Sequence, residues 1–126
     1  MLYLKKVIYC LAVLIMLTGC NGGNTVIKTI SSDDAKAMMD TRTDITIIDV
    51  REQNEYDSGH IKNAILLPLG SIEQEAKKTL PDKASTVLLY CRTGRRSASA
   101  AKKLEALGYT DIYDFGGITD WQYEIE

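Results

Sequence analysis

The amino-acid sequence predicts an α/β fold in which helices cover both faces of a parallel sheet. Residues 45–50, 65–67 and 86–90 are β-branched or aliphatic runs without strict alternation, which is typical of strands buried on both faces. Segments with helical spacing separate these runs, as crossovers between parallel strands require. The chain has 126 residues, which is the size of one domain with one core.

The first predicted helix follows Ser31. Ser31 is a favourable N-cap residue, Asp34 stands at the third helical position, and Ala35, Met38 and Met39 form one apolar face. The strand at 45–50 comes next along the chain.

The middle of the chain continues the alternation. The short strand at 65–67 is stopped by Pro68. Ser71 is then expected to open a helix by a capping box with Gln74, and Pro81 ends that helix.

The last third predicts a strand at 86–90, a helix at 97–107 with Ser97 as its N-cap, and a strand at 112–115. Gly108 closes the helix. Ligands of such sheets bind beyond the carboxyl ends of the strands, so the functional loops are expected there.

Composition and charge exclude several classes of protein. With 45% hydrophobic residues, 25% charged residues and two prolines, the chain is neither disordered nor collagenous. Its formal net charge of −2 argues against nucleic acid as a partner, since nucleic-acid binders carry a basic face.

The N-terminal segment predicts export. Lys5 and Lys6 precede an apolar run at 7–17, and at about 1.5 Å per residue this run is too short for a ~30 Å hydrocarbon core. We therefore expect a signal peptide at 1–19 and not a spanning helix.

The sequence Leu17-Thr-Gly-Cys20 resembles the bacterial lipobox, in which the cysteine is lipidated and becomes the new N-terminus. The alternative is an ordinary secretory signal with an accidental cysteine. The lipobox interpretation predicts a linker at 20–25, a folded domain at 26–126, and an extracytoplasmic protein anchored by lipid to a bacterial membrane.

Cysteine usage then isolates one thiol. Cys10 leaves with the signal peptide and Cys20 carries lipid, so Cys91 is the only free thiol and no intramolecular disulfide is expected. One histidine and one free cysteine provide no ligand set for zinc, so no metal is expected.

The loop that contains Cys91 predicts a reactive thiolate. Cys91 follows a buried strand directly, and Arg92, Arg95 and Arg96 surround it just before a helix. Backbone N–H groups at the start of a helix and nearby cations both favour the anionic form of a thiol. An exposed basic turn with an incidental cysteine is the alternative.

These features resemble the rhodanese family in its single-domain form. The resemblance covers about residues 27–122, with matches at 48–51, 55–56, 59–61, Ala64, 91–97, 116–118 and Trp121. It implies a three-layer α/β/α sandwich on a five-stranded parallel sheet. It also implies sulfurtransferase activity through a cysteine persulfide on Cys91, without a cofactor. The anion-binding loop of the family maps onto Arg92, Thr93, Gly94, Arg95 and Arg96.

The residues and the resemblance lead to one mechanism. The Cys91 thiolate attacks the outer sulfur of a small anionic donor such as thiosulfate, and cyanide or a thiol then accepts the sulfur. A protein can also serve as donor or acceptor.

The remaining matches are expected to be structural. Asp49 and Arg51, at the carboxyl end of a strand, support the active loop or form an ion pair. His60 is interpreted as part of a structural turn, Trp121 and Tyr123 as packing residues, and Ser97 as a cap that need not touch substrate.

Two other functions share this loop. Cysteine phosphatases need Cys-x5-Arg, and Ser97 stands where that arginine would be. A persulfide carrier without turnover, or a partner-binding module, is the second alternative.

Overall fold

The computed structural model describes residues 25–126. The predicted signal peptide, the lipobox with Cys20 and all but the last residue of the predicted linker lie outside the described residues. Among the described residues, no helix is both long and apolar enough to span a bilayer.

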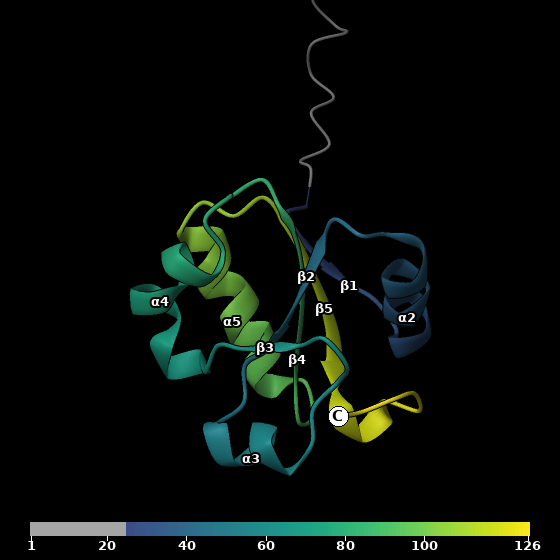
Figure 1. Ribbon diagram of the computed structural model, residues 1–126. Coiled ribbons are helices and arrows are strands. Elements are labelled where there is room, and N and C mark those ends of the chain that lie inside the picture. The colour runs from purple at the N-terminus through teal and green to yellow at the C-terminus, as the bar shows by residue number, and fades with distance from the viewer. Residues whose placement is uncertain (1–24) are drawn as a thin grey trace, which may run out of the picture.

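The core of the fold is a five-stranded sheet in the order β1-β5-β4-β2-β3. All of its pairings are parallel, which confirms the predicted fold class (Figure 1). The strands are β1 (Ile27–Thr29), β2 (Ile45–Asp49), β3 (Ile65–Leu66), β4 (Thr86–Cys91) and β5 (Asp111–Gly117).

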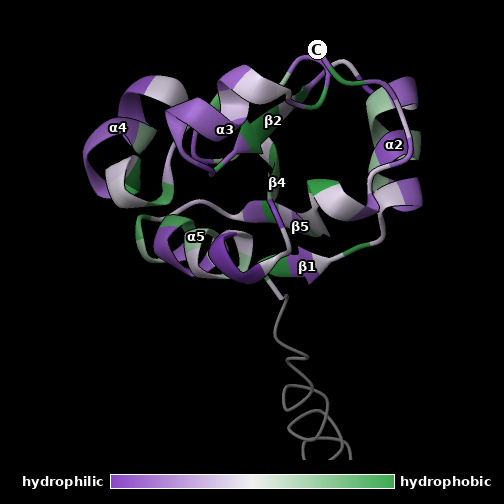
Figure 2. Cartoon of the chain, turned by 90° about the horizontal axis from the view of Figure 1, so that it is seen from below, coloured by the Kyte–Doolittle hydropathy of each residue, from purple (hydrophilic) through white to green (hydrophobic). Residues whose placement is uncertain are grey.

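Helices cover both faces of this sheet. They are α2 (Ser32–Thr41), α3 (Gln53–Ser58), α4 (Ile72–Thr79) and α5 (Arg95–Ala106), with 3-10 turns η2 (Leu69–Ser71) and η3 (Ile118–Asp120). Figure 2 shows α4 and α5 on one side of the strands and α2 on the other. Two buried clusters correspond to these faces, one lined by α4 and α5 and the other by Ala35 of α2.

The predicted strands and the first helix are confirmed closely. Ser31 caps α2, and its hydroxyl accepts from the N–H of Asp34 at 3.0 Å. Strand β4 is buried at every position, as a central strand without alternation should be. The sequence did not predict β1 or α3, because three residues give no period and α3 buries no residue.

Ser71 stands at the start of α4 as predicted, but its predicted capping box with Gln74 and the predicted cap at Ser97 are wrong. Ser71 precedes α4 but makes no side-chain cap hydrogen bond, because the 3-10 turn η2 already places it in a helical conformation. Ser97 is not the N-cap of α5: the helix begins at Arg95 after Gly94, which takes the positive φ of 104° that favours glycine. Ser97 therefore lies inside the first turn, where it is fully buried.

The register brings the candidate residues to one end of the sheet. Asp49 lies opposite Tyr90 across the β2–β4 pair, and Cys91 lies opposite Gly117 across the β4–β5 pair. Both pairs are at the carboxyl ends of their strands, where ligands of parallel sheets bind.

Candidate active site

Cys91 is the last residue of β4 and lies next to the start of α5. Its side chain is 1% exposed and belongs to the core cluster between the sheet and helices α4 and α5. Residues 92–94 turn the chain into α5, so the thiol lies beside the backbone N–H groups that open that helix. The predicted strand–loop–helix setting is confirmed.

Hydrogen-bond donors surround the sulfur. The N–H of Gly94 donates to Sγ at 3.0 Å, and Ser97 Oγ lies 3.7 Å from Sγ. Burial raises the pKa of the thiol. Donation from the N–H groups of Ser97, Gly94 and Thr93 and from the Ser97 hydroxyl lowers it by more, so the pKa of Cys91 lies below its ordinary value.

The loop is held by the end of β5 and by the turn η3 that follows it. The carbonyl of Arg92 accepts from the N–H of Thr119 at 3.2 Å and from its hydroxyl at 3.1 Å. Gly117 packs directly against this carbonyl, and a Cβ added to Gly117 would lie 2.1 Å from the Arg92 oxygen. The position of the loop therefore depends on a glycine distant from it in sequence.

The three arginines do not act alike. Arg96 forms a bidentate ion pair with Glu55 of α3, in which Nη1 and Nη2 donate to the two carboxylate oxygens at 2.7 and 2.8 Å. Arg92 and Arg95 are exposed, and their side chains make no hydrogen bond or ion pair with residues 25–126. The groups that lower the pKa of Cys91 most are the loop N–H groups and the Ser97 hydroxyl. Of the two causes expected from the sequence, backbone N–H groups and nearby cations, the N–H groups are thus among those with the largest effect on the pKa of Cys91.

The Glu55–Arg96 pair predicts a pH-dependent contribution to stability. The guanidinium of Arg96 holds the pKa of Glu55 at about 2, below the value of about 4.3 expected in the unfolded chain. The contribution is therefore fully present above about pH 4.3 and is lost as the pH falls through about 2. Glu55→Gln should lower the free energy of unfolding by about 1 kcal/mol at pH 7.

Urea denaturation at pH 7, 4 and 2.5 tests this expectation. The difference between Glu55→Gln and the unsubstituted protein should shrink as the pH falls. Glu75→Gln, at an exposed position of α4 with no ion pair in residues 25–126, is the control and should show little difference at any pH. A deficit in Glu55→Gln that stays constant with pH would contradict the assignment.

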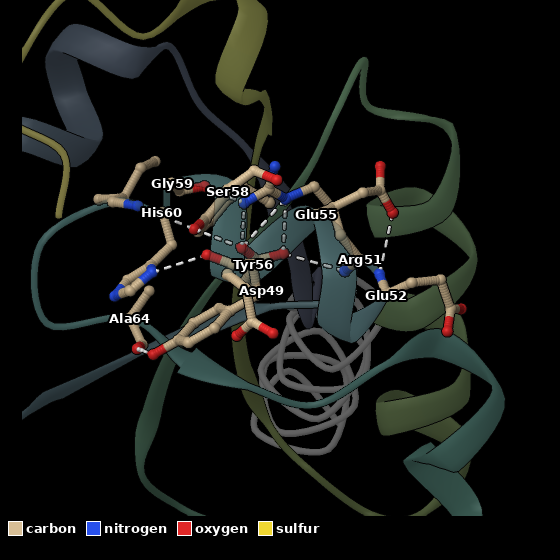
Figure 3. A network of polar contacts seen from close by, with 12 residues as sticks. Asp49, Arg51, Glu52, Glu55, Tyr56, Ser58, Gly59, His60 and Ala64 are labelled. Carbon is tan, nitrogen blue, oxygen red and sulfur yellow. Dashed lines mark hydrogen bonds and ion pairs between the residues drawn. The ribbon is translucent and has the colours of Figure 1, made fainter.

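Asp49 and Arg51 form a buried ion pair at the end of β2 (Figure 3). The Arg51 guanidinium binds both Asp49 oxygens and donates to the carbonyl of Gly59 at 2.7 Å. The Tyr90 hydroxyl donates to Asp49 at 2.7 Å and accepts from the N–H of Ile61. The network thus anchors the turn at 59–61 to the residue before Cys91. Of the two predicted roles, the structure shows the ion pair, and neither side chain hydrogen-bonds residues 92–96.

His60, the histidine of that turn, is held by structural contacts. Its ring stacks on Tyr56 with centroids 3.8 Å apart, and Nδ1 lies 3.0 Å from the Tyr56 carbonyl (Figure 3). The hydroxyl of Tyr56 donates to the carbonyl of Ala64. Trp121 packs against Phe115 with ring centroids 5.7 Å apart, and Tyr123 packs edge-on against Trp121 at the exposed rim.

Sequence reasoning did not assign roles to several residues of the site. Glu55 was part of a matched motif, but its pairing with Arg96 joins positions 41 residues apart. The contacts of Asp114 with Ser97 and of Thr119 with Arg92 span 17 and 27 residues. Within residues 25–126, no group of three or more His, Cys, Asp or Glu side chains is placed to hold a metal ion.

Comparison with known proteins identifies similar chains. Residues 31–124 match the family of the rhodanese-like domain. Thiosulfate sulfurtransferase PspE of Escherichia coli is 38% identical over 73 residues, covering 58% of this chain and 70% of PspE. Thiosulfate sulfurtransferase GlpE of Coxiella burnetii is 36% identical over 96 residues, covering 75% of this chain and 87% of GlpE.

A solved structure is also similar to this chain. A rhodanese with anions from E. coli superposes on this chain with a TM-score of 0.62 at 34% identity. The superposition covers 65% of this chain and 96% of the other.

Proposed function

The chain belongs to the family of rhodanese-like domains, and from this we propose that it moves a sulfane sulfur through a persulfide on Cys91. The relatives named thiosulfate sulfurtransferase support thiosulfate or a similar anion as donor, with cyanide or a thiol as acceptor. The observation that carries the proposal is the Cys91 sulfur, which is buried and surrounded by hydrogen-bond donors of the loop.

The reaction consists of two displacements at sulfur. The Cys91 thiolate attacks the outer sulfur of thiosulfate, the S–S bond of the donor breaks, and sulfite leaves with the bonding electron pair. The acceptor then attacks the outer sulfur of the persulfide, and Cys91 leaves as a thiolate. In both steps the thiolate is stabilised by the N–H groups of Gly94, Thr93 and Ser97.

The length of the loop favours sulfur transfer over phosphate hydrolysis. Only residues 92–94 separate Cys91 from α5, and the place of a phosphatase arginine is taken by the buried Ser97. Arg96 itself is paired with Glu55. These features support a site for one added sulfur atom.

Mass spectrometry after treatment with thiosulfate tests the proposal directly. We expect one added sulfur atom on the peptide that contains Cys91, and its loss on addition of cyanide, with steady-state turnover. Persulfide that forms only from a protein donor, without turnover of small donors, would favour the carrier function. Hydrolysis of aryl phosphates that depends on Cys91 would overturn sulfur transfer.

The exposed arginines predict an effect on the anionic donor. Arg92→Ala and Arg95→Ala should each raise KM for thiosulfate about two- to tenfold, because each removes an exposed cation close to Cys91 in the chain without removing the N–H groups at the sulfur. The corresponding Lys variants should recover part of the loss. Lys102→Ala, on the exposed surface of α5, removes the same charge and should leave KM unchanged. An unchanged KM in both arginine variants would contradict this role.

We also propose that Cys20 carries lipid and anchors the protein outside the cytoplasm. The support is the lipobox sequence after a short apolar run. The full chain should incorporate radiolabelled palmitate and partition with membranes, whereas Cys20→Ser should incorporate none and should remain uncleaved or be released. Palmitate incorporation that persists in Cys20→Ser would show that another residue carries the lipid.

A further inference from the structure

Ser97 is a buried hydroxyl with more hydrogen-bond acceptors than it has protons. Its Oγ lies 2.8 Å from Asp114 Oδ1, 3.0 Å from the carbonyl of Gly94 and 3.4 Å from that of Gly116. The Cys91 sulfur is 3.7 Å away on the same hydroxyl. A serine has one proton, so only one of these groups can receive it at a time.

The shortest of these contacts leads to a carboxylate. Asp114 is 7% exposed and accepts from the Ser97 hydroxyl and from the N–H of Gly116 at 3.0 Å. Its side chain forms no ion pair within residues 25–126. Hydrogen bonds to a charged acceptor are about twice as strong as those to a neutral one, so Asp114 competes well for the Ser97 proton.

We propose that the Ser97 hydroxyl switches between two acceptors, donating to Asp114 while the Cys91 sulfur is neutral and to Sγ when Cys91 is a thiolate. Asp114 is then a positioning residue that restrains formation of the thiolate by competing for the Ser97 proton. Its effect on sulfur transfer rests on the proposed function, whereas the contacts themselves do not.

The proton balance of the switch is simple. When Cys91 is a thiol, S–H donates to Ser97 Oγ and the Ser97 proton lies on the side of Asp114. On ionisation the thiol proton leaves to water, and the Ser97 hydrogen turns to the sulfur while remaining bonded to its own oxygen. Asp114 keeps the N–H of Gly116 as its donor. No covalent bond other than S–H is broken.

The other charged groups around the site are the same in the unsubstituted protein and in the variants at Ser97 and Asp114. Arg92, Arg95 and Arg96 lie on the loop and α5, and Glu55 of α3 and Glu52, the residue before α3, face Arg96. Asp49 and Arg51 form the ion pair at the end of β2. On the α2 side, Asp33 and Asp120 line a surface hollow beside Phe115, the neighbour of Asp114. None of these groups is altered by substitution of Ser97 or Asp114.

The test is the pH dependence of Cys91 alkylation by iodoacetamide in the full chain, followed by peptide mass spectrometry. Ser97→Ala removes a donor to the thiolate and should move the inflection of the rate up by about one pH unit. Asp114→Asn removes the competing charge and should move it down by about one pH unit. A structural role alone would move both variants in the same direction.

A double variant and a control sharpen the result. In the Ser97→Ala background, Asp114→Asn should have a smaller effect than it has alone, because Asp114 acts through the hydroxyl. Asp111→Asn removes a carboxylate from the other end of β5 and should leave the inflection unchanged. Shifts of the same sign in the two single variants, or equal effects of Asp114→Asn with and without Ser97, would overturn the proposal.

A measurement on unsubstituted protein covers the case in which Asp114→Asn does not fold. With 13C-labelled aspartate, the carboxyl resonance of Asp114 should change at the pH at which Cys91 ionises, and this change should vanish in Cys91→Ser. Its presence in Cys91→Ser would contradict the switch. Failure of thiosulfate to load Cys91, with both alkylation shifts intact, would refute the proposed function and leave the switch standing.

Discussion

Cys91→Ser should reduce sulfur transfer from thiosulfate to the level of the uncatalysed reaction, a loss of about 10³-fold or more. Serine fills nearly the same volume and its oxygen can accept from the N–H of Gly94, but a hydroxyl cannot form the persulfide. The free energy of unfolding should therefore change by only about 1 kcal/mol. Cyanide-dependent production of thiocyanate measures the first quantity, and urea denaturation measures the second.

The control for this substitution is Ser99→Ala, at an exposed position of the same helix, which should retain full activity. Mass spectrometry of Cys91→Ser after thiosulfate treatment should show no added sulfur on the peptide that spans residue 91. Undiminished turnover in folded Cys91→Ser would place the chemistry elsewhere in the chain and refute the persulfide mechanism.

The strands and the active loop were predictable because their signals are local. Strand β4 is a continuous apolar run, and Cys91 follows it directly, so the sequence alone placed the thiol at the carboxyl end of a buried strand. The parallel sheet followed from the same runs and the helices between them. The two edge strands differ in this respect. The apolar run before Pro68 predicted β3, whereas β1 was not predicted because it has three residues and no recognisable period.

The detailed chemistry of the site could not be predicted, because it depends on contacts between distant residues. A serine beside a helix start suggests an N-cap, and only the fold shows that Gly94 starts α5 earlier and that Ser97 turns towards Asp114. Three arginines beside a thiol suggest a cationic pocket. Only the position of α3 shows that Glu55 neutralises one of them. Local patterns therefore located the buried thiol and the N–H groups of its loop, but not the contacts that Glu55 and Asp114 make with that loop.

Gly117→Ala should disrupt the active loop more than any other single methyl group added near the site. The added Cβ would lie 2.1 Å from the Arg92 carbonyl oxygen, 2.6 Å from its carbon and 2.7 Å from Thr93 Cα. All three are backbone atoms, so the loop itself must move. Because φ and ψ of Gly117 are −129° and 150°, alanine can adopt this backbone conformation, and the effect is steric and not conformational.

The displacement should affect both stability and activity. We expect the free energy of unfolding to fall by about 1–3 kcal/mol, as in overpacked cores, and sulfur transfer to fall by at least about tenfold. The activity falls because the N–H groups aimed at Sγ move with the loop. Gly70→Ala is the matched control, since nothing lies within 4 Å of the Cβ it would add, and it should stay within about 0.5 kcal/mol of the unsubstituted protein. If Gly117→Ala matched Gly70→Ala in urea denaturation and in turnover, the contact between Gly117 and Arg92 would not be what positions the loop.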